Sequence, residues 1–165
     1  MISERIGVLG DGMEVFNRHR SHVADDESLK RIIREALLEI EVDTGKVVNT
    51  YTHDFGKIIG ERVCTPTVAG DDIIYAQRRN RRGLSRFVKG KEAEPTSKLT
   101  VVLMKNTEND EPCYILITAF YGDSVAKEPW DKFAEPNSKD FWNNHAFIWE
   151  KADILSGSVT KECPW

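Results

Sequence analysis

The chain has 165 residues, of which 40% are hydrophobic and 30% are charged, and its formal net charge is −4. These values predict one globular, soluble domain. They exclude a disordered chain, and no apolar run approaches the roughly 20 residues that a membrane-spanning helix needs. The first residues lack the apolar stretch of a secretory signal, and the three separated cysteines have no CxxC spacing. We therefore expect a cytoplasmic protein with no metal and no other cofactor, while signal-independent export as an effector stays open.

The first predicted element is an amphipathic helix that follows an irregular segment at residues 1–27. Glycines at positions 7, 10 and 12 interrupt that segment, and Ser28 is the predicted N-cap of the helix. The helix is indicated by apolar residues that recur at helical spacing: Leu29, Ile32, Ile33, Ala36, Leu37 and Ile40. Its apolar face has to be buried, and a sheet is the expected partner.

Strand patterns dominate the rest of the chain. Asp43-Thr44-Gly45 predicts a hairpin turn, and later strands are expected at 72–77, 84–88, 99–104, 114–120 and 145–149. The predicted fold is α+β, with an N-terminal amphipathic helix packed on a twisted, mostly antiparallel sheet. We expect a single domain over 28–150, with residues 151–165 forming a polar C-terminal tail.

One basic run stands out in this acidic chain. Residues 73–91 contain no carboxylate, and seven cations fall there: Arg78, Arg79, Arg81, Arg82, Arg86, Lys89 and Lys91. Such a concentration of positive charge favours RNA or another phosphate-rich ligand as partner. The alternative is a solvated segment whose cations pair with acidic neighbours from elsewhere in the chain.

A metal-independent cleavage of RNA phosphodiesters is the leading functional hypothesis. Histidine suits proton transfer near neutral pH, so His53 and His145 are the candidate base and acid. Arg86 would stabilise the charge that develops on phosphorus, and Thr118 would donate a hydrogen bond to the same phosphate. This hypothesis requires His53, Arg86 and His145 to converge on one cleft.

Other residues are candidates for holding the substrate. Arg78, Arg79, Arg81 and Arg82 would contact the backbone of RNA, since guanidinium groups match phosphate oxygens. Tyr75 and Trp142 are the candidate aromatic surfaces for bases, although either residue can equally belong to the core. His19 and His22 are auxiliary candidates for a phosphate contact.

Several short segments carry a resemblance to a known group of proteins: ERVC at 61–64, YAQR at 75–78, LSRFV at 84–88, LTVVL at 99–103, YILITAF at 114–120, EPW at 128–130 and FWNNHA at 141–146. Together they resemble part of a small, uncharacterised bacterial family, over roughly 52–149, and this resemblance implies no activity. In its order of elements the chain is also similar to small endoribonuclease toxins of the barnase, EndoU, colicin and RelE type. That similarity implies a toxin or effector, with an antitoxin or immunity protein as a further partner, but fold analogy does not establish function.

Two other functions stay open at the level of sequence. The arginine run can belong to a non-enzymatic module that binds nucleic acid or an acidic protein. It can also belong to an enzyme that acts on a small phosphorylated or nucleotide substrate, which a deep, enclosed pocket would favour.

Overall fold

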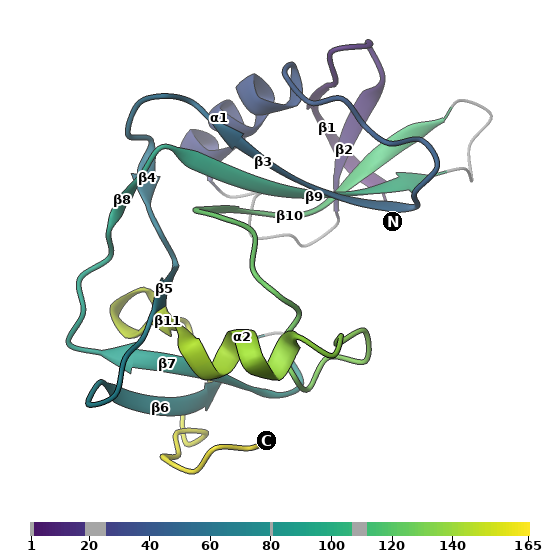
Figure 1. Ribbon diagram of the computed structural model, residues 1–165. Helices are drawn as coiled ribbons and strands as arrows, with labels where there is room; N and C mark the ends of the chain where they lie inside the picture. The colour runs from purple at the N-terminus through teal and green to yellow at the C-terminus, as the bar shows by residue number, and fades with distance from the viewer. Residues whose placement is uncertain (1, 19–25, 80, 107–111) are drawn as a thin grey trace. The chain divides into compact units, whose positions relative to one another are not determined.

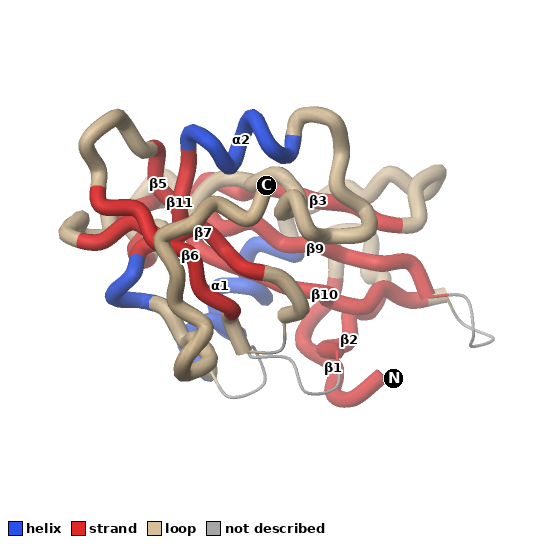
Figure 2. The backbone as a smooth tube through the Cα atoms, turned by 90° about the horizontal axis from the view of Figure 1, so that it is seen from below, coloured by secondary structure: helices blue, strands red, loops and turns tan. Residues whose placement is uncertain are grey.

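The computed structural model describes residues 2–18, 26–79, 81–106 and 112–165. In these residues the protein is mostly β, with three sheets and two α-helices (Figures 1 and 2). The chain forms two compact units: unit 1 is Met1–Gly60 with Pro95–Ser124, and unit 2 is Glu61–Glu94 with Val125–Trp165. The predicted fold, an N-terminal helix on one sheet, is therefore wrong, because two strands precede the helix and the strands belong to separate sheets.

Unit 1 contains a five-stranded sheet and one helix. Its elements are β1 Ile2–Val8, β2 Glu14–Arg18, α1 Glu27–Leu37, β3 Val48–Asp54, β9 Lys98–Asn106 and β10 Cys113–Tyr121. The order in the sheet is β1-β2-β10-β9-β3, in which β2 and β10 are parallel and the other neighbours antiparallel. The nearly apolar strand β10 is central, and β3 is an edge strand.

The core of unit 1 lies between α1 and one face of this sheet. Leu29, Ile33 and Leu37 on the helix are buried in the same cluster as Leu99, Val101 and Leu103 of β9. Side chains three or four positions apart share one face of a helix, and alternate side chains share one face of a strand. The apolar face of α1 therefore packs against the apolar face of β9. The N-cap is Asp26 rather than Ser28, since its Oδ1 accepts from Leu29 N at 3.0 Å.

Residues 1–27, predicted to be irregular, contain the antiparallel pair β1 and β2 instead. Of the glycines that suggested irregularity, Gly7 lies within β1, and Gly10 and Gly12 lie at the turn between the strands. Gly12 has a φ of 90°, and Leu9 N donates to Met13 O at 2.9 Å to close the turn. Glycine adopts such a φ without steric cost. His19 and His22 fall outside the described residues.

Unit 2 contains a four-stranded sheet, a short helix and the last part of the chain. Its elements are β5 Cys64–Pro66, β6 Asp72–Gln77, β7 Leu84–Lys89, α2 Ser138–Asn144, β11 His145–Ile148 and the 3-10 turn η2 Trp149–Lys151. The order is β5-β11-β7-β6, with β7 and β11 parallel. Buried Trp142 of α2 packs against Phe147, with ring centroids 4.8 Å apart.

The segment predicted as a polar tail, 151–165, lies along β6. Leu155 N donates to Gln77 O, and Thr160 exchanges two backbone hydrogen bonds with Tyr75, each of 2.8 Å. Trp165 then contacts the Tyr75 ring edge-on, with centroids 5.4 Å apart. The outer edge of β6 is thus covered by the chain's own later residues.

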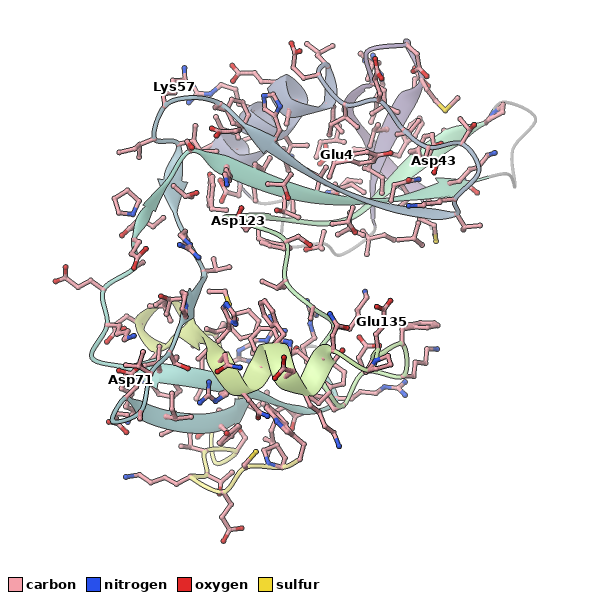
Figure 3. All side chains as sticks on the ribbon, in the orientation of Figure 1. Glu4, Asp43, Lys57, Asp71, Asp123 and Glu135 are labelled. Carbon is pink, nitrogen blue, oxygen red and sulfur yellow. The ribbon has the colours of Figure 1, made fainter. Side chains whose placement is uncertain are left out.

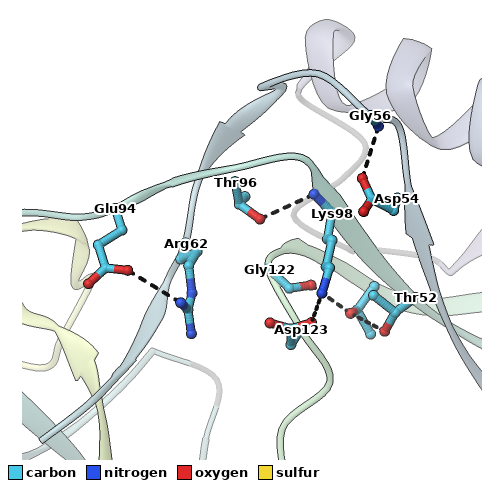
Figure 4. A network of polar contacts seen from close by, with 10 residues as sticks. Thr52, Asp54, Gly56, Arg62, Glu94, Thr96, Lys98, Gly122 and Asp123 are labelled. Carbon is cyan, nitrogen blue, oxygen red and sulfur yellow. Dashed lines mark hydrogen bonds and ion pairs between the residues drawn. The ribbon is translucent and has the colours of Figure 1, made fainter.

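The chain passes between the units at 60/61, 94/95 and 124/125. The first two passages lie in a two-stranded sheet of β4 Gly60–Glu61 and β8 Pro95–Thr96. In unit 1 a polar network follows β8, in which Lys98 Nζ lies 3.1 Å from Asp123 and Thr52 pairs with Thr100 at 2.8 Å (Figure 4). No helix of the described ranges has both the length and the apolar character to span a membrane.

Candidate nucleic-acid interface

The basic run forms one antiparallel hairpin of unit 2. Strands β6 and β7 pair from Asp72–Lys89 to Gln77–Leu84, so the turn lies between Gln77 and Leu84. Gln77 Nε2 donates to Arg81 O at 2.6 Å, and Arg81 N donates to Arg78 O at 3.2 Å. The turn is therefore bonded to itself and to the end of β6.

Arg78 is held inside the unit. Its Nη2 lies 2.7 Å from Glu128 Oε2, its Nε donates to Ser85 Oγ at 3.1 Å, and its guanidinium lies 4.4 Å from the centre of the Phe147 ring. The Glu128 side chain is only 9% exposed. A buried carboxylate needs such a partner, so these contacts assign Arg78 a structural role in joining the turn to the 128–133 loop.

Other cations of the run also meet acidic or aromatic neighbours. Lys91 Nζ lies 3.0 Å from a carboxylate oxygen of Asp71, the residue just before β6 (Figure 3). Lys89 Nζ lies 5.1 Å from the centre of the Trp149 ring. The pKa of Asp71 is lowered, first by the hydrogen bond from Val68 N and then by Lys91. Lys89 and Lys91 therefore fit the alternative interpretation of the basic run, in which its cations pair with neighbours from the same chain.

The cations at the tip of the turn differ from Arg78, because they are exposed. Arg79 is 60% exposed and pairs at 2.7 Å with Asp153, which is 77% exposed. Arg81 and Arg82 are exposed as well. Exposed ion pairs are weak, so the Arg79–Asp153 contact leaves Arg79 open to exchange for another anion.

A second loop packs on this turn through Trp130. A Cβ added at Gly83 would overlap the Trp130 indole, so only a glycine allows the ring to lie this close to the backbone. Three residues further on, Phe133 is 66% exposed, and Lys132 Nζ lies 5.1 Å from its ring. Two loops fixed to one another therefore carry a set of residues that we call the turn–loop surface: Arg79, Arg81, Arg82, Lys132 and Phe133.

Arg86 is held rigidly by strand β7, as its strand position predicts. Its Nη1 donates to Thr67 Oγ1 at 2.8 Å and to the carbonyl oxygen of His145 at 3.0 Å. It also pairs across the sheet with Tyr75, whose pKa is raised by burial and by its hydrogen bond to Cys163. The Tyr75 side chain is buried, with 6% exposed, and its ring meets Trp165, so it packs inside unit 2.

His145 ends α2. Its Nδ1 lies 2.9 Å from the carbonyl oxygen of Phe141, and its ring stacks on the Phe141 ring at 4.0 Å. This is the contact of a histidine that satisfies one of the last carbonyls of a helix, which leaves Nε2 as the nitrogen for any further role. Trp142 is fully buried and donates to Ala126 O at 3.0 Å, so it offers no exposed face to a base.

The four predicted catalytic residues are divided between the units. Arg86 and His145 lie in unit 2, and His53 and Thr118 lie on β3 and β10 of unit 1. His53 contacts Phe55 edge-on at 4.7 Å, and Thr118 follows an irregularity in the pairing of β10 with β9. Within one unit, the structure brings together only Arg86 and His145, through the carbonyl group of the histidine.

Two other kinds of site, a metal centre and a nucleophile at Cys64, find no support among the described residues. No group of three or more histidine, cysteine, aspartate and glutamate residues is arranged there to hold a metal ion. Burial raises the pKa of Cys64 to about 12, so its nucleophilic thiolate form is scarce at neutral pH.

Sequence reasoning places Phe133 and Trp130 in a late aromatic group, but it connected neither these residues nor Lys132 with the arginine turn, and it did not predict the Gly83–Trp130 contact. The sequence Arg-Arg-Gly at 81–83 does indicate a special position, because a glycine ends the arginine turn. The tryptophan that packs against this glycine lies 47 positions further on, so no local pattern identifies it. No protein-family model, curated protein or solved structure matches the chain. The resemblances to a bacterial family and to endoribonuclease toxins therefore stay expectations.

Proposed function

We propose that the protein is a non-enzymatic module that binds single-stranded nucleic acid, with RNA as the first candidate, through the turn–loop surface. The observation that carries this proposal is the fixed pairing of two loops, one with three exposed arginines and one with an exposed phenylalanine beside a lysine. Proteins of this kind combine cations for the backbone with an aromatic side chain on which a base stacks.

The arginines supply the part of this binding that does not depend on sequence. Guanidinium groups bind phosphate oxygens through paired donors, and counterions leave the nucleic acid as they do so. Because the contacts of Arg78, Gly83 and the Arg81 backbone hold the turn, its backbone needs little further ordering when the exposed arginine side chains bind. Pre-organisation of this kind favours affinity.

Phe133 distinguishes a nucleic acid from other polyanions. A polyanion without apolar groups, such as poly-glutamate, would use the arginines alone, whereas a base also gains from stacking on the exposed ring, worth about 1–3 kcal/mol per base. The combination therefore favours a nucleic acid over a polyanion that contributes charge alone. The ribonuclease mechanism ranks second, supported by the bond between Arg86 and the His145 carbonyl.

The test measures binding of a fluorescent single-stranded RNA of mixed sequence, as anisotropy, across a range of salt concentrations and with EDTA present. We expect Arg81→Ala/Arg82→Ala to weaken binding and to make the slope of log K against log salt shallower by about 1.4, or about 0.7 per lost phosphate contact. Phe133→Ala should weaken binding by about fivefold or more with little change in slope.

The matched control is Arg31→Ala/Lys57→Ala, which removes two exposed cations from unit 1. Equal loss in this control would contradict the turn–loop surface and indicate a diffuse charge effect. Equal binding of poly-glutamate would contradict the role of Phe133. Cleavage of the RNA in EDTA that His145→Ala abolishes would replace this proposal with the ribonuclease mechanism.

A further inference from the structure

The edges of the larger sheets differ in how they are protected. An exposed strand edge carries unpaired N–H and C=O groups, and natural proteins blunt such edges with bulges, proline, lysine or covering segments. In the four-stranded sheet, residues 154–160 cover β6, and β5 is short and ends in Pro66. In the five-stranded sheet, β1 is interrupted by two register shifts.

Strand β3 has none of these protections. Its seven residues, VNTYTHD, contain neither proline nor lysine, and they pair with β9 in seven consecutive positions without a register shift. Among the described residues, β9 is the only strand that pairs with β3. Figure 1 shows β3 as a long, regular strand at the edge of its sheet.

The hydrogen bonds to β9 establish which groups point outward. Lys105 N donates to Val47 O, and Phe55 N donates to Ser97 O, each at 2.8 Å. Backbone groups alternate in direction along an antiparallel pair, so the odd-numbered residues 47–55 bond inward to β9. The N–H and C=O groups of Val48, Thr50, Thr52 and Asp54 therefore face the open edge, and all four side chains are exposed as well.

This edge is complementary to itself. If a second β3 runs antiparallel with the two-fold axis at Tyr51, Val48 lies opposite Asp54 and Thr50 lies opposite Thr52. Every outward-facing residue then meets another outward-facing residue, which gives about eight intermolecular hydrogen bonds. No like charges lie opposite each other. Exposed Val47, at 65%, meets Phe55 of the other copy.

We propose that two copies of the chain associate through β3, in antiparallel register about Tyr51, to form a continuous ten-stranded sheet. The second copy is favoured over an unrelated strand because this one register uses the whole strand on both sides. In a register shifted by one residue, outward-facing groups of one copy would lie opposite inward-facing groups of the other, and the regular hydrogen bonds would not form. Registers shifted by two would leave part of β3 unpaired.

The test uses the full chain and measures its molar mass by light scattering after size exclusion, over a dilution series. We expect twice the mass of one chain at high concentration and dissociation on dilution. Thr50→Lys/Thr52→Lys places lysine opposite lysine at both pairs and should give a monomer. Thr50→Lys/Thr52→Glu places lysine opposite glutamate at both pairs and should stay dimeric.

These two variants are a matched pair. Both replace the same exposed threonines, and both lose the hydroxyl contact of Thr52 with Thr100 (Figure 4). We expect the dissociation constant of the Lys/Lys variant to exceed that of the Lys/Glu variant by about tenfold or more. Far-UV circular dichroism and melting confirm that both are folded.

Three results would overturn the proposal. The first is a wild-type chain that stays monomeric at its highest soluble concentration. The second is a Lys/Lys variant that dimerises as well as the wild type, which would locate the interface elsewhere. The third is a Lys/Glu variant as monomeric as the Lys/Lys variant, which would exclude the register about Tyr51. Since the turn–loop surface lies in unit 2, the outcome is independent of RNA binding.

Discussion

Arg78, Arg81 and Arg82 carry the same charge within five positions of sequence, but their surroundings give them different roles. Arg78 is bonded to nearly buried Glu128, whereas Arg81 and Arg82 are exposed. The sequence identified all three as phosphate contacts because charge is visible in a sequence and burial is not. Glu128 lies 50 positions away, and nothing local to either residue marks it as the partner.

Removal of Arg78 should therefore cost stability rather than only affinity. Arg78→Met leaves the Glu128 carboxylate without its ion partner, and we expect the free energy of unfolding to fall by about 2–3 kcal/mol, since Arg78 itself is partly exposed. Urea denaturation measures this change. Arg78→Met/Glu128→Leu should recover much of the lost unfolding free energy, because it also removes the unpaired carboxylate.

Arg79 is the matched control for this change. Its ion pair with Asp153 is exposed on both sides, so Arg79→Met should cost about 0.5 kcal/mol or less. Equal losses for Arg78→Met and Arg79→Met would show that Glu128 does not depend on its partner.

At the scale of elements, strands were easier to predict than the way they assemble. The expected strands at 72–77, 84–88, 99–104 and 114–120 correspond to β6, β7, β9 and β10, because alternation and β-branched residues are local signals. β1 and β2 were not predicted, because the glycines near the start of the chain indicated an irregular segment. The parallel pairings of β2 with β10 and of β7 with β11 depend on residues far apart in sequence.

At the candidate site, too, the contacts between segments far apart in sequence could not be predicted. The strands expected at 72–77 and 84–88 leave four of the arginines in the connection between them, but the loop that completes the surface comes from 128–133, which no local pattern links to it. The histidines carried the strongest chemical expectation, yet His53 and His145 belong to separate units. Residue type suggests chemistry, while only the fold determines which residues meet.

The contact between Gly83 and Trp130 should control the turn–loop surface. Gly83→Ala forces the indole away, because its Cβ would overlap the ring, and we expect a loss of about 1–3 kcal/mol in stability together with weaker RNA binding. Thermal unfolding and anisotropy measure the two effects. In a Trp130→Ala background the added cost of Gly83→Ala should largely vanish. Equal costs in both backgrounds would show that the two residues are not coupled.

At the scale of the whole molecule, the two units are interleaved along the chain. Unit 1 is interrupted by 61–94 and unit 2 by 95–124, yet each has its own sheet and its own buried clusters. The sequence predicted a single domain over 28–150 because composition changes little at the passages between units. No linker-like run of glycine, serine or proline marks them.

The pairing of β4 with β8 brings the two ends of the 61–94 insertion together. Ile59 N donates to Thr96 O at 2.9 Å, and Arg62 N donates to Glu94 O at 2.8 Å. A short glycine–serine linker between residues 60 and 95 can therefore replace the insertion without distorting unit 1. Loop closure costs only about 0.6 kcal/mol for each doubling of loop length, so the length of the replaced segment matters little.

We expect the resulting chain, 1–60 linked to 95–124, to fold on its own, since its core of α1 against β9 and β10 is complete. A dispersed amide spectrum and a cooperative thermal transition are the measurements that check this. The control is the same chain without 113–121, which should stay unfolded because β10 is the central strand that joins β2 to β9. If the linked chain lacks a cooperative transition, the core of unit 1 depends on residues of unit 2, and the division into two cores is wrong.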